Sequence, residues 1–226
     1  MKKILAGVFV MIIASVAVQA QEKTLATVEG AADLERVKRA RFRETYVNTE
    51  VDFTRYSKLL LGDAYFDYRD VGEPQRYRSS MMTTGSRAAF SISNEERERF
   101  EQVVDEAFTK ELSKSKVFEI VESLDENTII MRGAVVDIIF SVPPGFDGRS
   151  KIYLSSVGDA TLVMEFLDGK TGEVLARVAE RRAIGSQHVA AVALPTNQAN
   201  VWHDVRRWAR DSARRLRSEL ESAMED

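Results

Sequence analysis

VGDATLVMEFLDGKTGEVLARVAERR, residues 157–182, is the part of the sequence with the clearest structural signature. Apolar side chains alternate with more polar ones around Met164 and again around Ala176, which is the two-residue period of a β-strand. Asp168–Gly172 lies between the two runs and supplies residues that tolerate positive φ. The stretch therefore predicts a β-hairpin. Because an isolated hairpin is only marginally stable, other strands or helices must cover its apolar side.

Further strands are predicted before the hairpin. Thr128–Val142 is a long apolar run, typical of a central strand, and Gly133 within it is expected to mark a bulge. Val117–Glu122 predicts a short strand. Leucines at 59–61 predict a buried strand, which continues into a half-exposed strand at about 64–68.

Two helices are indicated by apolar residues at helical spacing. Ser93 and Glu96 form a capping box at the start of a helix over about 94–115. A second helix is expected over about 200–223, with a stripe that includes Trp202 and Leu216. A row of arginines lines its flank: Arg206, Arg210, Arg214 and Arg217. Two interpretations remain open, a solvated face with intrahelical partners such as Asp211 and Glu221, or contact with an acidic partner or lipid phosphate.

The order of these elements predicts an α+β protein. We expect a two-layer α/β sandwich, with a mostly antiparallel sheet of about five strands and two main helices on one face. The domain organisation that we expect is a signal peptide over 1–20, an N-terminal arm over 21–45 and a single α/β domain over 46–226. A short helix is expected within the arm, over about 31–43.

The first residues have the pattern of a secretory signal peptide. Lys2 and Lys3 precede an uncharged run, and Ala20 fits a cleavage site before Gln21. An uncleaved anchor is the rival interpretation, but a membrane span needs about 20 apolar residues and this run is shorter. The sequence thus predicts a periplasmic protein whose mature form has no transmembrane segment. The chain contains no cysteine, so it has no lipobox cysteine for lipid attachment.

Composition excludes several classes of function. The net charge is −3, and removal of Lys2 and Lys3 makes it more negative, which argues against nucleic-acid binding. The absence of cysteine excludes thiol catalysis and cysteine zinc sites. The two histidines, His188 and His203, are far apart and lack the spacing of a metal motif, so we expect no metal and no cofactor.

The function that remains is a non-enzymatic periplasmic or cell-envelope module for binding or assembly. Neither a nucleophile elbow nor a Walker A sequence is present, and no pair of carboxylates stands out by its spacing. The alternative is a periplasmic hydrolase that uses an unrecognised carboxylate or serine site. The expected partner is a cell-envelope protein or an anionic envelope component, and the sequence leaves the oligomeric state open.

The loop over 142–156 is the candidate partner-binding segment. Its prolines and glycines restrict and reverse the chain, and its side chains Phe146, Arg149 and Tyr153 offer aromatic surface and a planar cation. In the alternative interpretation the aromatic residues pack on the sheet, and Arg149 pairs with Asp147 or Asp159.

Four stretches resemble a known family: YVNTEVDFTRYSKLLL (46–61), FSISNEERERF (90–100), VPPGFDGRSKIYLSSVGDATL (142–162) and DGKTGEVLARVAERR (168–182). They are similar to the bacterial exported domain-of-unknown-function family 3313. The resemblance implies an envelope protein with a small α/β domain, and it transfers no catalytic residue. Many members resemble lipoproteins, whereas this chain lacks the lipobox cysteine.

Overall fold

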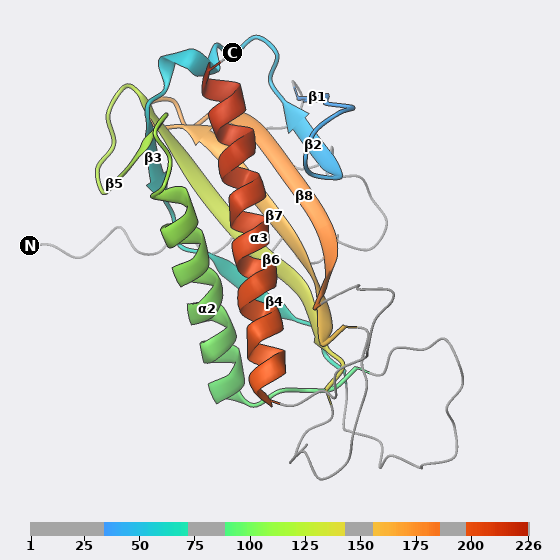
Figure 1. The fold of residues 1–226 in the computed structure, drawn as a ribbon. Coiled ribbons are helices and arrows are strands. Elements are labelled where there is room, and N and C mark those ends of the chain that lie inside the picture. Colours follow the sequence, from blue (N-terminus) through green and yellow to red (C-terminus); the bar gives the residue numbers. More distant parts are fainter. Residues whose placement is uncertain (1–33, 72–88, 143–155, 186–197, 226) are drawn as a thin grey trace, which may run out of the picture.

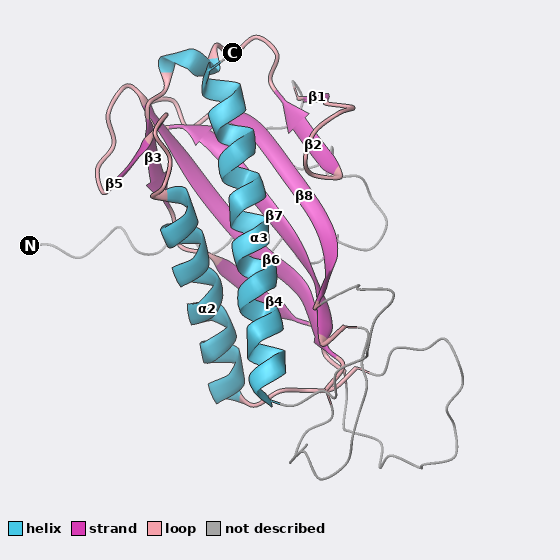
Figure 2. Ribbon diagram, in the orientation of Figure 1, coloured by secondary structure: helices cyan, strands magenta, loops and turns pink. Residues whose placement is uncertain are grey.

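The protein is a curved sheet with two helices side by side on one of its faces (Figures 1 and 2). This computed structural model describes residues 34–71, 89–142, 156–185 and 198–225. The predicted signal peptide and the candidate residues Phe146, Arg149 and Tyr153 lie outside the described residues. The expected α+β class with both helices on one face is confirmed.

The hairpin that the sequence predicted is present. β7 (Gly158–Asp168) and β8 (Val174–Ile184) pair antiparallel along their whole length, from Gly158↔Ile184 to Leu167↔Val174. The turn between them needs a positive φ, which Gly172 supplies at 74°. On one side of β7 the alternating side chains Leu162, Met164 and Phe166 are buried in the main core.

The sheet has eight strands rather than about five, and it is mixed rather than mostly antiparallel. Its order is β1-β2-β8-β7-β6-β3-β5. β4 is outside this order and pairs with a later part of β6 than β3 does. The strands not yet given are β1 (Glu35–Arg36), β2 (Glu44–Val47), β3 (Lys58–Leu61), β4 (Tyr65–Tyr68), β5 (Glu119–Val121) and β6 (Thr128–Phe140). β3 and β4 both run parallel to β6, and β3 runs parallel to β5. The parallel pairs arise because the chain leaves β3 and β4, passes through a helix over the face of the sheet, and returns in the same direction.

The first two strands were not predicted. Within the described residues, the helix expected over 31–43 is wrong, because Glu35–Arg36 pairs with Tyr46–Val47 in a small antiparallel hairpin. β2 in turn pairs with β8, with Tyr46 opposite Arg177. Partners more than a hundred residues away therefore hold this segment in the sheet.

α2 (Asn94–Leu112) begins and packs as the sequence predicted, although it ends three residues before the expected position. The Ser93 hydroxyl accepts from the Glu96 amide at 3.2 Å, and the Glu96 carboxylate accepts from the Ser93 amide at 2.9 Å. The capping box is therefore complete. The ring of Phe100 is fully buried and lies edge-on against Phe140, at 5.6 Å between ring centroids.

α3 (Gln198–Glu225) is the longest helix among the described residues. It lies beside α2 and runs in the same direction (Figure 1). Its predicted apolar stripe is confirmed: Trp202, Val205, Ala209, Leu216 and Leu220 are all buried. The intrahelical partners expected for its arginine row are confirmed at two positions. Arg214 binds Asp211 at 3.0 Å and Arg217 binds Glu221 at 3.1 Å. Arg206 and Arg210 are exposed.

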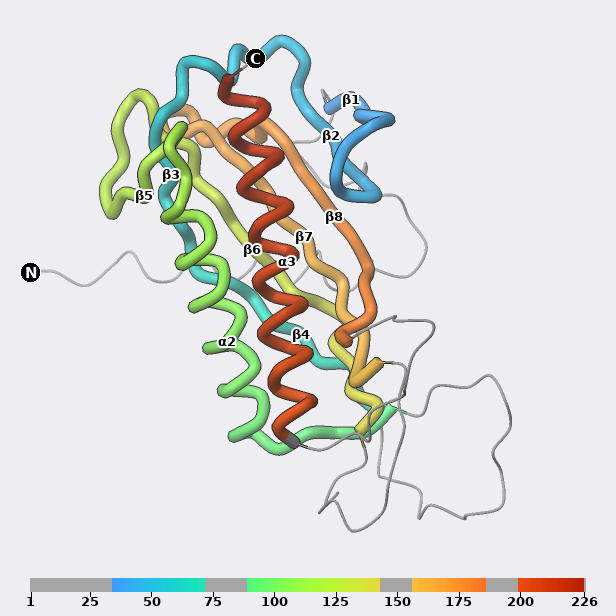
Figure 3. Tube along the Cα trace, in the orientation of Figure 1, coloured from blue at the N-terminus to red at the C-terminus, as the bar shows by residue number. Residues whose placement is uncertain are grey.

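The buried carboxylate of Asp168 links the β7–β8 turn by hydrogen bonds to the segment that joins β2 to β3. This segment contains a short 3-10 helix, η2 (Phe53–Arg55), and passes the end of α3 (Figure 3). Asp168 is 2% exposed and accepts hydrogen bonds from the Tyr56 hydroxyl at 2.6 Å and from the Arg55 guanidinium at 2.5 Å. Its other oxygen accepts from the amides of Lys170 and Thr171, both at 2.8 Å. One side chain thus shapes the turn and ties it to a distant part of the chain.

Candidate functional site

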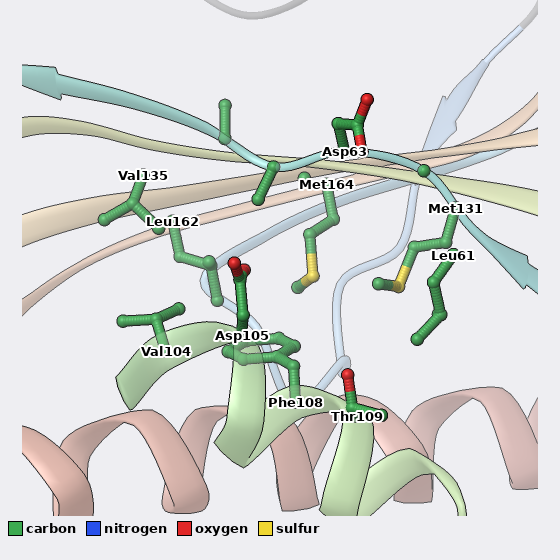
Figure 4. A pocket seen from close by; sticks show the side chains of 14 residues that line it. Leu61, Asp63, Val104, Asp105, Phe108, Thr109, Met131, Val135, Leu162 and Met164 are labelled. Atoms are coloured by element: carbon green, nitrogen blue, oxygen red, sulfur yellow. The ribbon is translucent and has the colours of Figure 1, made fainter. Parts of the chain in front are cut away.

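The candidate site is a cavity of about 360 Å³ between α2 and the sheet, which we call the α2 cavity (Figure 4). It lies beside Leu61–Ala64, which comprise the last residue of β3 and the link to β4. Part of its lining comes from α2 and part from β6 and β7. This volume falls in the range of small-molecule sites, about 300–1,000 Å³.

Gly133 explains why space remains beneath α2. Side chains at alternate positions of β6 face the helices, and in this row Met131 and Val135 are buried on either side of Gly133. A Cβ built at Gly133 would meet no atom within 4 Å. The missing side chain therefore leaves open space in an otherwise filled row.

The bulge that the sequence placed at Gly133 lies elsewhere. Pairing with β7 is regular through Arg132↔Glu165, Gly133↔Met164 and Ala134↔Val163. The register shifts instead between Val136 and Ile139, where Asp137 has a φ of 55°. A non-glycine residue in this region is uncommon and needs surrounding contacts to hold it.

Arginine contacts hold Asp137 in place, so we assign it a structural role. The Arg69 guanidinium donates to both of its carboxylate oxygens, at 2.5 and 2.6 Å, and Arg181 donates to one of them. Burial alone would raise the pKa of Asp137, but the hydrogen bonds from Arg69 and Arg181 lower it. The Asp137 carboxylate is thus already paired with two cations, Arg69 and Arg181.

The floor of the α2 cavity is apolar. It is built from buried side chains of three elements: Val104 and Phe108 of α2, Met131 and Val135 of β6, and Leu162 and Met164 of β7. Figure 4 shows the two methionines and Leu61 pointing from the strands toward the helix. Methionine adapts its shape readily, so this floor suits an apolar group of variable outline.

The mouth of the cavity is acidic. Four residues of the lining are exposed to solvent: Asp63, Ala64, Asp105 and Thr109. Helical spacing explains two of these positions. Val104 and Phe108 face the floor, and the next residues along, Asp105 and Thr109, lie one step around the helix toward its outer side (Figure 4).

Asp105 is an exposed carboxylate with a raised pKa. Desolvation raises its pKa, and the neighbouring charges of Glu101 and Asp63 raise it further. Among the described residues, neither Asp105 nor Asp63 forms an ion pair, whereas several carboxylates of the sheet and of α3 do: Asp137, Glu165, Glu180, Asp211 and Glu221. The mouth therefore presents a local negative potential next to an apolar floor.

The described lining lacks the groups that catalysis by a histidine or by a buried nucleophile needs. His188 lies outside the described residues, and His203 is exposed on α3, with its ring 3.9 Å from the Asp204 carboxylate. Within the described ranges, no group of three His, Asp or Glu residues is placed to hold a metal ion. In the same ranges, no helix is long and apolar enough to cross a membrane.

The sequence reasoning missed the α2 cavity. Its lining comes from four segments spread over about a hundred residues, and only tertiary packing brings them together. The one available signal was Gly133 in an apolar strand, which also fits a bulge. The predicted site residues Phe146, Arg149 and Tyr153 lie outside the described residues, so their role stays a prediction.

The comparisons with known proteins give a family and distant structural likenesses. The model of a family described as "Protein of unknown function (DUF3313)" matches residues 30–216. The comparison with curated proteins finds no match. A PelC dodecamer from Paraburkholderia phytofirmans is similar at 10% identity over 74% of this chain and 89% of that chain, with a TM-score of 0.34. A Xanthomonas campestris protein of the DUF330 family model is similar at 11% identity over 75% and 87%, with a TM-score of 0.38. These scores are too low for the likeness to say anything about function.

Proposed function

The chain belongs to the DUF3313 family, whose description assigns no activity, and we propose that it is a non-enzymatic binding or assembly module of the cell envelope. In this proposal the signal peptide over 1–20 directs the protein to the periplasm, and residues 46–226 act there as a single domain. Its partner is a component of the envelope that places an apolar group in the α2 cavity.

The α2 cavity is the observation that carries the proposal. Most apolar side chains of this protein pack against one another in one continuous core. Beside Gly133 that packing stops, although a methyl group there would meet no clash. Interiors are normally close-packed, so a gap of this size costs stability. A bound apolar group would recover the lost contacts.

A hydrolase is the alternative, and it would depend on Asp63 and Asp105. The raised pKa of Asp105, caused first by desolvation and then by Glu101 and Asp63, is the feature that favours it. Against it, the described lining contains neither a histidine nor a cation that would stabilise a developing negative charge. Binding therefore accounts for the lining better than hydrolysis does.

Replacing Gly133 with leucine tests the proposal, because it fills the cavity from the strand side. The variant should keep or slightly raise the melting temperature, since the added side chain enters open space and glycine is unfavourable within a strand. Its affinity for the neutral, two-ring fluorescent probe 1-methylnaphthalene should fall at least about tenfold, a loss of about 1.4 kcal/mol of binding free energy.

Val163→Leu is the matched control. Val163 of β7 pairs with Ala134, the neighbour of Gly133 on β6, but it does not line the cavity. This variant should bind the probe as the wild type does. Equal probe binding by the wild type and Gly133→Leu would mean that the α2 cavity is not a binding site. A large loss of stability in Gly133→Leu would show instead that neighbouring side chains already need this space, so that it is not free for a ligand.

The loop over 142–156 is a second proposed contact, through Phe146, Arg149 and Tyr153. A planar guanidinium suits a carboxylate or phosphate of an envelope partner. Arg149→Ala should leave the melting temperature unchanged and reduce the capture of that partner by tagged protein from periplasm. A loss of more than about 2 kcal/mol of stability would instead place Arg149 in a buried network.

A further inference from the structure

The α2 cavity differs from an ordinary packing gap because its apolar floor ends at two carboxylates. Asp63 comes from the link between β3 and β4, and Asp105 comes from α2, so two separate elements bring negative charge to one opening. In Figure 4 Asp105 points from the helix toward the sheet. Both residues are exposed, and neither has an ion-pair partner in the described structure.

We propose that the α2 cavity binds a small amphiphilic amine, whose apolar part occupies the floor and whose ammonium group lies at the mouth lined by Asp63 and Asp105. This inference rests on the proposed function, and it adds the chemical class of the ligand. Beyond desolvation, the like charges of the nearby Glu101 and of Asp63 raise the pKa of Asp105, because they repel its carboxylate. A cation placed at the mouth relieves that repulsion and is attracted by both carboxylates.

The size of the cavity limits the apolar part of the ligand. A cavity of about 150 Å³ in another protein holds benzene, so the 360 Å³ found here has room for roughly twice that group. An alkyl chain of about eight carbons or a two-ring aromatic group meets this limit. Both tails of a two-chain phospholipid do not, and the ligand is therefore a single-chain or aromatic amine.

The floor adds specificity for an apolar rather than a polar amine. Its side chains are hydrocarbon or thioether, from Phe108, Met131, Leu162 and Met164. Burying about 100 Å² of apolar surface there gains affinity, whereas a polyamine would bring charges that the floor cannot pair. The mouth then selects the sign of the head group, and the floor selects the apolar body.

Three probes of equal chain length separate these two effects: octylammonium, octan-1-ol and octanoate, each below its micelle concentration. Calorimetry on the mature protein should rank octylammonium above octanol and octanol above octanoate, with at least a tenfold difference in affinity between the two ions. The difference should shrink as salt is added, because exposed charges are screened. Gly133→Leu should weaken all three probes.

Asp63→Asn and Asp105→Asn keep the shape of the mouth and remove its charge. Each variant should lower the ratio of octylammonium to octanoate affinity about threefold, and the double variant should bring it close to one. Octanol affinity should not change in any of them. Glu98→Gln, an exposed charge of α2 outside the cavity lining, is the control and should leave the ratio unaltered.

The outcomes distinguish the two proposals. Equal affinity for all three probes, or a preference for octanoate, would overturn the amine inference and leave the apolar cavity as a binding site. Failure of all three to bind the wild type would overturn both. A ratio that stays high in the folded double variant would show that the preference arises elsewhere, and the assignment to Asp63 and Asp105 would be wrong.

Discussion

Replacing Leu216 with aspartate is expected to leave the protein largely unfolded at room temperature. Leu216 is 1% exposed and belongs to the apolar stripe by which α3 joins the core. The change removes a buried leucine, which costs about 2–5 kcal/mol, and it adds the cost of an unpaired carboxylate. The sum approaches the whole stability of a typical domain, about 5–15 kcal/mol. Far-ultraviolet circular dichroism and urea unfolding measure the result.

Arg210→Asp is the matched control for this prediction. Arg210 lies on the same helix, receives the same new side chain and is exposed. The free energy of unfolding should change by less than about 1 kcal/mol there, because surface substitutions usually have small effects. A Leu216→Asp protein that melts within about a degree of wild type would show that α3 does not pack on the sheet.

The helices and the hairpin could be predicted because their signals are local. Ser93 and Glu96 are three residues apart, and the stripe around Leu216 repeats at helical spacing. The alternation around Met164 and the glycine at 172 likewise lie within one short stretch. In each case neighbours in the sequence supply the interactions that define the element.

The rest of the sheet could not be predicted, because its strands are short and their partners are distant. β2 has four residues, and its Tyr46 finds its partner at Arg177. β3 and β4 look like one interrupted strand, and nothing in their sequence says that both run parallel to β6. The bulge at Asp137 is defined by pairing with β7 and by contacts with Arg69 and Arg181.

The α2 cavity illustrates the same limit for function. Gly133 has two consequences that the sequence cannot separate, a bulge or a gap in the core. Only the pairing with Met164 and the position of α2 show that it is a gap. In the sequence Asp105 is one of several acidic residues on an exposed helix face. The structure adds that Asp63, from the β3–β4 link, lies near it at the same cavity.

Asp168 is a further case in which the sequence showed only part of a residue's role. The turn residues at 168–172 predicted the hairpin, and the two amides that Asp168 accepts belong to that local turn. Its bonds with Arg55 and Tyr56 cross more than a hundred residues and have no local signal. The ring of Tyr56 is also covered by the Arg55 guanidinium, at 4.7 Å from the ring centroid.

Asp168→Ala should therefore lower the free energy of unfolding by about 3–4 kcal/mol at pH 7, as measured by urea denaturation. The change leaves the buried Tyr56 hydroxyl without its acceptor and removes the partner of Arg55. Glu126→Ala is the control: Glu126 binds Lys170 of the same turn, but both side chains are exposed, and little effect is expected.

The effect of Asp168 should depend on pH in a defined direction. Burial alone would raise the pKa of Asp168, but hydrogen bonds from Tyr56, Thr171 and Lys170 and the charge of Arg55 lower it to about 2. Because the unfolded value is about 3.9, the carboxylate stabilises the fold fully above about pH 5, and this stabilisation is lost as the pH falls from about 4 to 2. The stability difference between the wild type and Asp168→Ala should thus shrink by about 2 kcal/mol over that interval. A difference that stays constant down to pH 2 would mean that the contacts of Asp168 do not require its charge, and that its role is confined to the shape of the turn.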